Sequence, residues 1–301
     1  MCKGLTLNGV TNMDTQTLKA FIAVAEAQSF STAASQLHLT QPAISKRIRT
    51  LEEQLNTQLF ERHNRTVSLT HAGHLLLPKA HKILDLVADT ELSLSNSSQQ
   101  IEGPLALGTS HHIGLHKLPP ILSQFVADHP AVNLQLEFMD SEFAFKSIRE
   151  RKLDLALSTL STTPEDDIEQ ITLWQDKMVI VCGHQHPLSR TSVITLEQLT
   201  QHHAILPDSN TITFNLLADL FTEQNLKLES EISTNYLETN KMLASVGLGW
   251  TMLPSSMIDN NLHIMRVDCK KIYRALGIIY LKNRTLPNTA NALLNLACSL
   301  K

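Results

Sequence analysis

Residues 29–49 constrain the fold of this chain more than any other stretch, because they indicate two short helices joined by a tight turn. The first helix holds an Ala33-Ala34 pair, whose small side chains let two helices approach closely. Thr40 is a favourable N-cap for the second helix, and Pro42 falls in its first turn, where the missing N–H costs no hydrogen bond. The stretch therefore predicts a helix-turn-helix.

The second helix presents two different faces. Its apolar residues recur with the spacing of one buried helical face: Ile44, Ile48, Leu51 and Leu55. Another face carries hydrogen-bonding side chains flanked by two cations: Gln41, Ser45 and Arg49, with Lys46 and Arg47. A helix that reads the major groove needs a buried apolar face and, opposite it, hydrogen-bonding side chains near its N-terminus. Ordinary amphipathic surface helices show the same pattern, so the flanking segments must decide between the two interpretations.

Both flanks favour DNA binding. Residues 14–27 predict a further helix with four apolar side chains on one side: Leu18, Phe21, Ile22 and Ala25. Residues 59–70 predict a small hairpin, or wing, because Val67 and Leu69 alternate with polar residues after a polar tip. Arg62 and Arg65 are placed there to meet phosphate or a minor groove. A three-helix unit with a wing predicts binding to duplex DNA.

Residues 13–70 resemble the winged helix-turn-helix of LysR-type transcriptional regulators. The matching elements are Phe30-Ser31, Ala33-Ala34, Leu39 to Ser45, Ile48, Leu51-Glu52, Leu59 to Arg62, Leu69-Thr70 and Ala72-Gly73. The resemblance extends over the whole chain and implies an α/β architecture. Its expected parts are an N-terminal winged helix-turn-helix, a long linker helix and a C-terminal two-lobed, periplasmic-binding-protein-like, doubly wound effector domain.

The resemblance also implies partners and a set of contacts. A regulator of this type is a cytoplasmic homodimer or homotetramer that binds double-stranded promoter DNA, a small-molecule effector and RNA polymerase, and no membrane. The expected DNA-binding residues are Thr32, Thr40, Gln41, Pro42, Ser45, Lys46, Arg49, Arg62, Asn64, Arg65 and Thr66.

Composition is that of a water-soluble globular protein. The chain has 301 residues, of which 43% are apolar and 18% charged, and it contains no apolar run long enough to span a bilayer. Residues 1–12 have one Lys and no apolar core, so we expect a disordered tail there instead of a signal peptide, with Met13 as an alternative start. The net charge is −4, but cations gather between residues 40 and 66, which predicts specific, salt-sensitive DNA binding.

Other chemistry is not expected. The four cysteines form no CxxC pair, which indicates a reduced cytoplasmic protein. Histidines gather at His71/His74, His111–His116 and His184/His186, but no thiolate or carboxylate accompanies them at metal-site spacing, so neither a metal nor a cofactor is predicted. Gly247-Leu-Gly249 lacks the third glycine of a dinucleotide fingerprint, and hydrolase and phosphate-loop motifs are absent from the sequence. A solute-binding protein and, after it, an α/β enzyme remain the alternatives.

Residues 71–96 predict a long linker helix. Its apolar seam steps by four and three residues: Leu76, Ala80, Ile83, Val87, Thr90 and Leu94. Pro78 is expected to interrupt the hydrogen-bond ladder near the first turns. The helix either pairs two subunits, as the resemblance implies, or packs on its own domain. Polar residues 95–100 and Gly103-Pro104 predict a hinge, after which residues 97–301 form the effector domain.

Beyond the hinge, strand and helix patterns alternate, which predicts parallel sheets with right-handed crossovers. We expect lobe I at residues 103–177 and 274–301, and lobe II at residues 178–273. Further segments that resemble the family are residues 152–156, 186–188, 246–250 and 253–254.

A ligand in such a domain binds beyond the carboxyl ends of the strands. The expected effector-binding residues are Thr109, Ser110, His111, His112, Ser158 and Thr159 in lobe I, and Asp208, Ser209, Asn210, Asn235, Tyr236 and Gly249 in lobe II. Their hydroxyls, amides and imidazoles predict a small polar metabolite that bears a carboxylate, held by Ser110 and the helix start after it. The alternative is that the Ser and Thr residues here are ordinary caps and turn residues.

Overall fold

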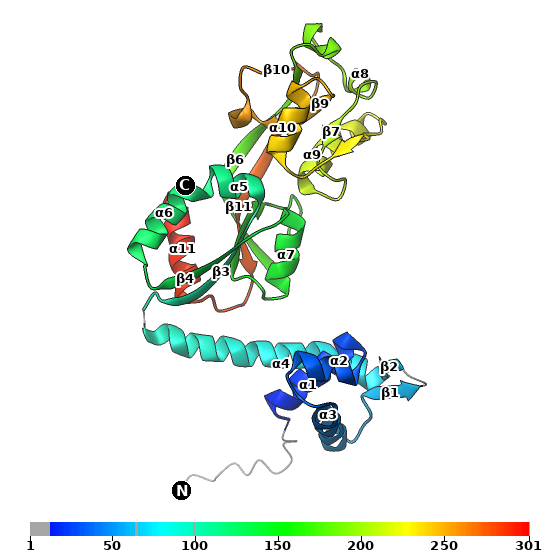
Figure 1. The fold of residues 1–301 in the computed structure, drawn as a ribbon, viewed down its shortest axis with the longest axis vertical. Helices are drawn as coiled ribbons and strands as arrows, with labels where there is room; N and C mark the ends of the chain where they lie inside the picture. Colours follow the sequence, from blue (N-terminus) through cyan, green and yellow to red (C-terminus); the bar gives the residue numbers. More distant parts are fainter. Residues whose placement is uncertain (1–12, 64–65, 99, 301) are drawn as a thin grey trace. The chain divides into compact units, whose positions relative to one another are not determined.

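The computed structural model describes residues 13–63, 66–98 and 100–300, and it divides the chain into two compact units, Met1–Ser97 and Ser98–Lys301 (Figure 1). The tail predicted for residues 1–12 lies outside the described residues, as does the wing tip at 64–65. In the described part of the chain, no helix combines the length and the apolar character needed to cross a membrane.

The first unit is a helix-turn-helix with a wing and a long helix. Its elements are α1 (Thr15–Ala27), α2 (Phe30–Gln36), α3 (Gln41–Leu55), β1 (Phe60–His63), β2 (Thr66–Leu69) and α4 (His71–Ser95). Each helix starts after a polar residue whose side chain accepts a hydrogen bond from a backbone N–H of the first turn: Asp14, Ser29, Thr40 and Thr70. Ile44, Ile48 and Leu51 of α3 are fully buried against Leu18 and Phe21 of α1, as the helical spacing predicts.

Helix α4 runs without interruption through Pro78. Ala80 of the predicted seam is buried in the core of the first unit, whereas Ile83 and Leu94 are 38% and 70% exposed. The start of α4 therefore completes the helix-turn-helix core, and the remainder carries an exposed apolar strip.

The second unit is built on a seven-stranded sheet in the order β10-β6-β11-β5-β3-β4, with β9 also paired to β6. Its strands are β3 (Gly103–Thr109), β4 (Val132–Phe138), β5 (Leu155–Thr159), β6 (Ile168–Gly183), β9 (Trp250–Pro254), β10 (Leu262–Ile264) and β11 (Ile272–Leu281); β7 (Ile205–Leu206) and β8 (Ile232–Ser233) form a separate pair. The alternating pattern predicts parallel sheets, but only β3–β4, β3–β5 and β7–β8 pair in parallel among the described strands. The long strands β6 and β11 return antiparallel, so the sheet is mixed.

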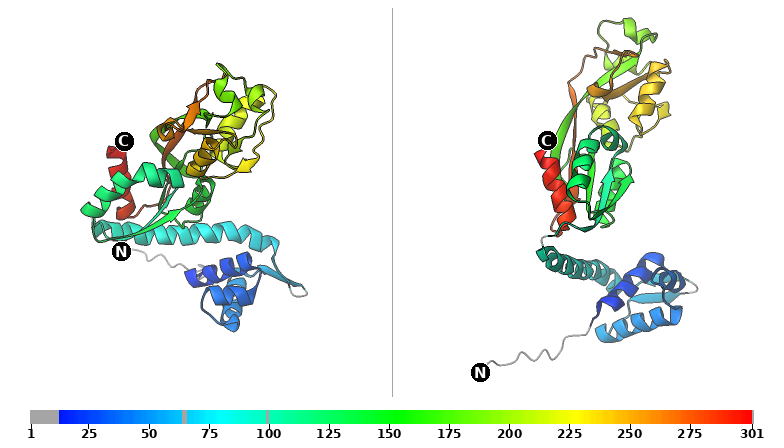
Figure 2. Two further views of the ribbon diagram at one scale, coloured as in Figure 1. Left: turned by 45° about the horizontal axis from the view of Figure 1, so that its top comes forward. Right: turned by 60° about the vertical axis from the view of Figure 1, so that its left-hand side comes forward.

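Strands β6 and β11 run side by side through both ends of this unit (Figure 2). Strand β6 starts at Ile168 and therefore runs unbroken across the expected lobe boundary between residues 177 and 178. The helices are α5 (His111–His116), α6 (Leu118–Asp128), α7 (Ser141–Arg149), α8 (Leu196–Leu199), α9 (Ile212–Glu223), α10 (Leu237–Ser245) and α11 (Asn288–Ser299).

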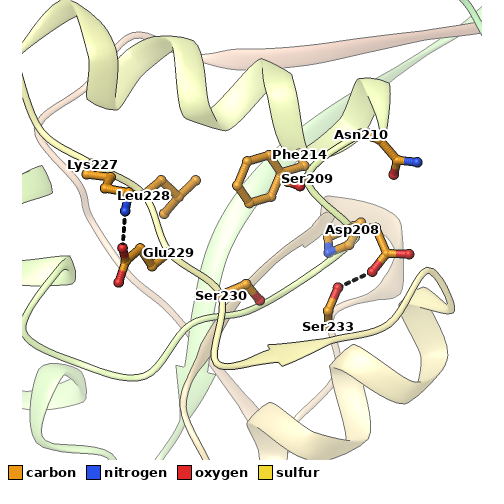
Figure 3. A pocket seen from close by; sticks show the side chains of 10 residues that line it. Asp208, Ser209, Asn210, Phe214, Lys227, Leu228, Glu229, Ser230 and Ser233 are labelled. Carbon is orange, nitrogen blue, oxygen red and sulfur yellow. Dashed lines mark hydrogen bonds and ion pairs between the residues drawn. The ribbon is translucent and has the colours of Figure 1, made fainter.

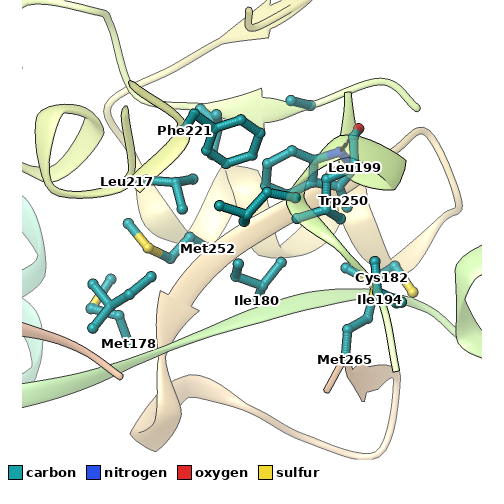
Figure 4. Packing of buried hydrophobic residues seen from close by; sticks show 14 of the residues in the cluster. Met178, Ile180, Cys182, Ile194, Leu199, Leu217, Phe221, Trp250, Met252 and Met265 are labelled. Atoms are coloured by element: carbon teal, nitrogen blue, oxygen red, sulfur yellow. Dashed lines mark hydrogen bonds between the residues drawn. The ribbon is translucent and has the colours of Figure 1, made fainter. Parts of the chain in front are cut away.

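Separate apolar cores define the two ends, which we call lobe I and lobe II. In lobe I, α6 and α11 pack on β3, β5 and β11. In lobe II, Trp250 is fully buried and stacks on Phe221, with ring centroids 6.4 Å apart (Figure 4). The indole N–H of Trp250 donates to the backbone carbonyls of Leu199 and His202, each at 3.1 Å, so the largest core side chain leaves no polar atom unsatisfied.

Candidate DNA interface and ligand cavity

Helix α3 presents the predicted polar face to solvent. Gln41, Pro42, Lys46 and Arg49 are exposed and Ser45 is half-buried, while the opposite face of the helix is in the core. Thr40 is the N-cap of the helix, and its hydroxyl accepts a hydrogen bond from the Ala43 N–H at 3.4 Å. Thr32 of α2 is also exposed. These side chains are therefore available to a ligand as large as duplex DNA.

Two charged residues of α3 have internal partners. The Arg49 guanidinium lies 2.9 Å from the Glu53 carboxylate one turn on, although 78% of the Arg49 side chain is exposed. Arg47 instead donates to the Gln16 side chain at 3.3 Å, which ties it to α1. Arg49 can therefore contact DNA if it leaves Glu53. Arg47 instead links α3 to α1 through Gln16.

Glu52 fixes the wing to the same helix. Its carboxylate accepts hydrogen bonds from the backbone N–H groups of Leu59 at 2.8 Å and Phe60 at 3.3 Å. The wing strands pair in register, with Arg62 opposite Val67 and His63 opposite Thr66. The structure describes Arg62 and Thr66 only through their backbone, and Asn64 and Arg65 lie outside the described residues. Their contacts with DNA stay predictions.

A cavity of about 50 Å³ lies between lobe I and lobe II. Five predicted effector residues line it: Ser110, His111, His112, Thr159 and Asn235. The other lining residues are Asp140, Ser141, Glu142, Pro207, Thr211, Thr213, Leu237 and Arg274. Ser110 is the N-cap of α5, and its hydroxyl makes no capping hydrogen bond. The cavity is much smaller than the roughly 300 Å³ of a typical ligand pocket.

Arg274 brings a buried positive charge to this cavity. It is almost wholly buried and donates to the Asp176 carboxylate at 2.8 Å and to the Thr213 hydroxyl at 3.2 Å, while its Nε has no hydrogen-bond partner among the described residues. The prediction from sequence missed Arg274 and Asp176. The available signal was Arg274, the single charged residue of β11, whereas Asp176 gave none because β6 also holds Glu169 and Lys177.

Asp176 is ionised in this setting. Its burial opposes ionisation, but the contact with His112 and the hydrogen bond from Arg274 outweigh burial and lower the pKa of the carboxyl to about 2. The His112 Nε2 lies 3.4 Å from the Asp176 carboxylate but forms no hydrogen bond with a described residue.

Hydrogen bonds join the two lobes around the cavity. Glu142 of α7 accepts from the Ile212 N–H at the start of α9 at 2.8 Å, and Asn235 donates to Asp140 at 2.8 Å. His116 of α5 lies 2.8 Å from the Glu238 carboxylate of α10. These three links span the two lobes.

The remaining predicted effector residues lie elsewhere. Asp208, Ser209 and Asn210 line an open hollow of about 760 Å³ in lobe II, where the Ser233 hydroxyl donates to Asp208 (Figure 3). The Asn235 amide donates to Asp208 and to Asp140, so it connects this hollow to the cavity.

Four predicted residues are not among those that line the cavity: Thr109, Ser158, Tyr236 and Gly249. Thr109 and Ser158 are fully buried, and each hydroxyl donates to the carbonyl of the next residue. Tyr236 is half-exposed, with its ring edge-on to His111 at 4.9 Å. A Cβ on Gly249 would lie 2.3 Å from the His203 carbonyl oxygen, so this glycine allows close backbone packing.

Sequence comparisons match both units to one family. Residues 15–74 match the model of the bacterial regulatory helix-turn-helix protein of the lysR family, and residues 98–298 match the LysR substrate binding domain. A helix-turn-helix transcriptional regulator of Azotobacter vinelandii is 57% identical over 108 residues, which are 36% of this chain and 75% of that protein. A probable RuBisCO transcriptional regulator of Porphyra purpurea is 30% identical over 89% of this chain and 87% of its own.

Solved structures share the fold. A full-length OxyR variant of Pseudomonas aeruginosa aligns with a TM-score of 0.65 and 20% identity over 96% of this chain and 94% of its own. Full-length CbnR in complex with its target DNA aligns at 0.52 and 21% identity over 95% and 98% of the two chains. The effector binding domain of QuiR in complex with shikimate aligns at 0.59 and 22% identity over 66% of this chain and 97% of its own. With both of its units matched, this chain belongs to the LysR family of transcriptional regulators.

Proposed function

We propose that the first unit binds promoter DNA by laying α3 in a major groove, with Gln41, Ser45 and Arg49 on base edges. The observation that carries the proposal is the division of α3 into a buried apolar face and an exposed polar face at its N-terminal end. Thr32, Thr40, Pro42 and Lys46 lie on or next to this face. Arg62, Asn64, Arg65 and Thr66 of the wing then hold the phosphate backbone or the minor groove.

Two copies of the chain pair through the apolar strip of α4. Ile83, Leu86, Val87 and Leu94 of this helix are exposed large hydrophobic side chains, whose burial against a second copy is favourable. A homodimer carries two copies of α3, which fit two half-sites of a partly palindromic operator. By resemblance to the family, two dimers form a tetramer that bends the DNA and contacts RNA polymerase in the cytoplasm.

The second unit acts as the sensor, and no catalytic role is assigned to it. A small metabolite with a carboxylate binds in the cavity between the lobes, against the Ser110 hydroxyl and the buried Arg274. The ligand contacts both lobes, so it shifts an equilibrium between open and closed arrangements, and this shift alters the DNA bend.

Genomic fragments retained by the purified chain at moderate salt test the DNA proposal. We expect a few sharply enriched sites that share a dyad motif. Arg49→Ala should then lose roughly 1–3 kcal/mol of binding free energy at one base position and relax specificity there. Equal weakening on every sequence would place Arg49 on phosphate, and an unenriched library would remove α3 as a sequence reader.

Tryptophan fluorescence tests the effector proposal, since both tryptophans of the chain, Trp174 and Trp250, lie in the second unit. A panel of mono- and dicarboxylates is titrated into the protein, and each binder is then tested for its effect on operator affinity. Ser110→Ala should leave DNA affinity intact but weaken the response to the binder. An unchanged response would remove Ser110 from the site.

A further inference from the structure

Two histidines and one carboxylate meet at the junction of the lobes. His112 and His116 lie one turn apart on α5, and Glu238 comes from α10, 122 positions from His116 in the chain. One potential ligand atom of each residue lies within 4.8 Å of the other two. Figure 1 shows α5 at the end of lobe I that faces lobe II. The pair is therefore presented from one lobe and the carboxylate from the other.

Several atoms of this cluster lack a partner. Neither ring nitrogen of His112 has a hydrogen bond to any described residue, although only 6% of the residue is exposed. The second carboxylate oxygen of Glu238 is likewise buried without a hydrogen bond in the described chain. Leaving such groups unsatisfied is costly, so buried polar atoms that converge on one point indicate a ligand that the protein itself does not supply.

The surroundings suit a metal ion. Histidines at positions i and i+4 of a helix place both rings on one face, which is the spacing of two-histidine metal sites. A metal-bound imidazole uses one nitrogen as the ligand and commonly turns the other toward a carboxylate. For His112 that carboxylate is Asp176, 3.4 Å from Nε2 and already bound by Arg274. The His116 side chain is 45% exposed and already lies 2.8 Å from the Glu238 carboxylate.

We propose that His112, His116 and Glu238 bind one divalent transition-metal ion, of which Zn²⁺ is the best fit, and that the ion links the two lobes. Two imidazoles and one carboxylate are ligands that Zn²⁺ accepts in a tetrahedron, and they leave a fourth position for water or a carboxylate. Tetrahedral Zn²⁺ needs ligand atoms about 3.4 Å apart, so binding draws the three side chains together. Glu238 is 122 positions from His116, so no motif of neighbouring residues reveals this set of ligands. This proposal does not depend on which metabolite the cavity takes.

The binding test uses the tag-free full chain after chelation and dialysis, titrated with Zn²⁺ in competition with a metallochromic dye. We expect one tight site per chain, weakened at least tenfold by His116→Gln and by Glu238→Gln. The matched control is His203→Gln, because the His203–Glu231 histidine–carboxylate pair belongs to no candidate metal cluster among the described residues. Circular dichroism checks that each variant is folded. Equal affinity in the wild type and both variants would overturn the site.

Cobalt substitution identifies the ligands. Co²⁺ at this site should give the visible absorption of a tetrahedral ion without a near-ultraviolet thiolate band. A thiolate band would place the metal on a cysteine and overturn the proposal.

Hydrogen exchange tests the link between the lobes. Zn²⁺ should slow amide exchange in both α5 and α10 of the wild type, and in neither helix of Glu238→Gln. Protection confined to α5 would mean that the two histidines hold the ion alone, and the bridging role would be wrong.

Discussion

Arg274 and Asp176 stand directly opposite each other on β11 and β6. Their side chains form an ion pair at 2.8 Å, and each side chain is 96% buried. Each charge offsets part of the cost of burying the other. The pair lies where the two long strands pass between the lobes, next to the cavity. A one-residue shift of register would leave both buried charges unpaired, which disfavours other registers of the two strands.

Asp176→Asn should destabilise the second unit by about 3–5 kcal/mol, because it leaves the buried Arg274 charge without a counter-charge. Urea unfolding followed by tryptophan fluorescence measures this change in the second unit alone. Lys270→Met serves as the control, since its pair with Glu223 is largely exposed and should contribute no more than about 1 kcal/mol. Equal effects of the two substitutions would show that burial of the Arg274 pair has no energetic weight.

Glu53→Gln should tighten operator binding about two- to fivefold, because it releases Arg49 from its exposed ion pair and removes a negative charge beside the DNA. Fluorescence anisotropy with a labelled operator measures the affinity. Glu26→Gln makes the same charge change on α1 and should have a smaller effect. If Glu26→Gln raises operator affinity as much as Glu53→Gln, the cause is the change in net charge and not the release of Arg49.

Acid should destabilise lobe II through His186. This buried ring accepts a hydrogen bond from the Leu188 N–H at 3.2 Å, and burial, followed by the neighbouring His202, lowers the pKa of His186 below its ordinary value. The unfolded chain therefore takes up the proton first as pH falls through roughly 6.5, and stability present above that pH is lost below it.

His186→Asn keeps a capping acceptor but cannot titrate in this range. The drop in unfolding free energy between pH 7.5 and 5.5 should be smaller in this variant than in the wild type. An identical drop in both proteins would assign the acid sensitivity to other groups.

Gly249→Ala should destabilise lobe II by about 1–3 kcal/mol, since its Cβ would lie 2.3 Å from the His203 carbonyl oxygen. The His203 carbonyl also accepts a hydrogen bond from the backbone N–H of Trp250 at 2.9 Å. Tryptophan fluorescence should therefore also change in the folded variant. Val246→Ala, at an exposed neighbouring site, is the control. A variant as stable as the wild type would restore Gly249 as a candidate for direct ligand contact.

The sequence predicted best what short-range rules determine. Thr40, Pro42 and the spacing of Ile44 and Ile48 are local signals, and the helix-turn-helix appears where they place it. The strands and most helices of the second unit were also predictable from their apolar patterns. Strand β10 was not, because Leu262 is its single buried side chain and gives no periodic signal.

Pairings over long sequence distances could not be predicted. Arg274 finds Asp176 only after β11 has returned antiparallel to β6, and Glu238 meets His116 only because two lobes close on each other. A residue pattern shows that a strand is buried but not which strand lies beside it. The contacts that complete the cavity also join distant segments, which is why eight of its thirteen lining residues were not predicted.

The return of β11 to lobe I has a consequence for how the protein is made. The core of lobe I joins β3 and β5 to Leu276, Ile278 and the inner face of α11, while all of lobe II is synthesised between these two groups. On the ribosome, the DNA-binding unit can fold as soon as it has left the exit tunnel. Lobe I cannot complete its core until β11 and α11 have also been synthesised. A chain stopped before β11 would therefore carry a folded helix-turn-helix attached to an unfinished sensor, and premature termination would yield DNA binders that no metabolite controls.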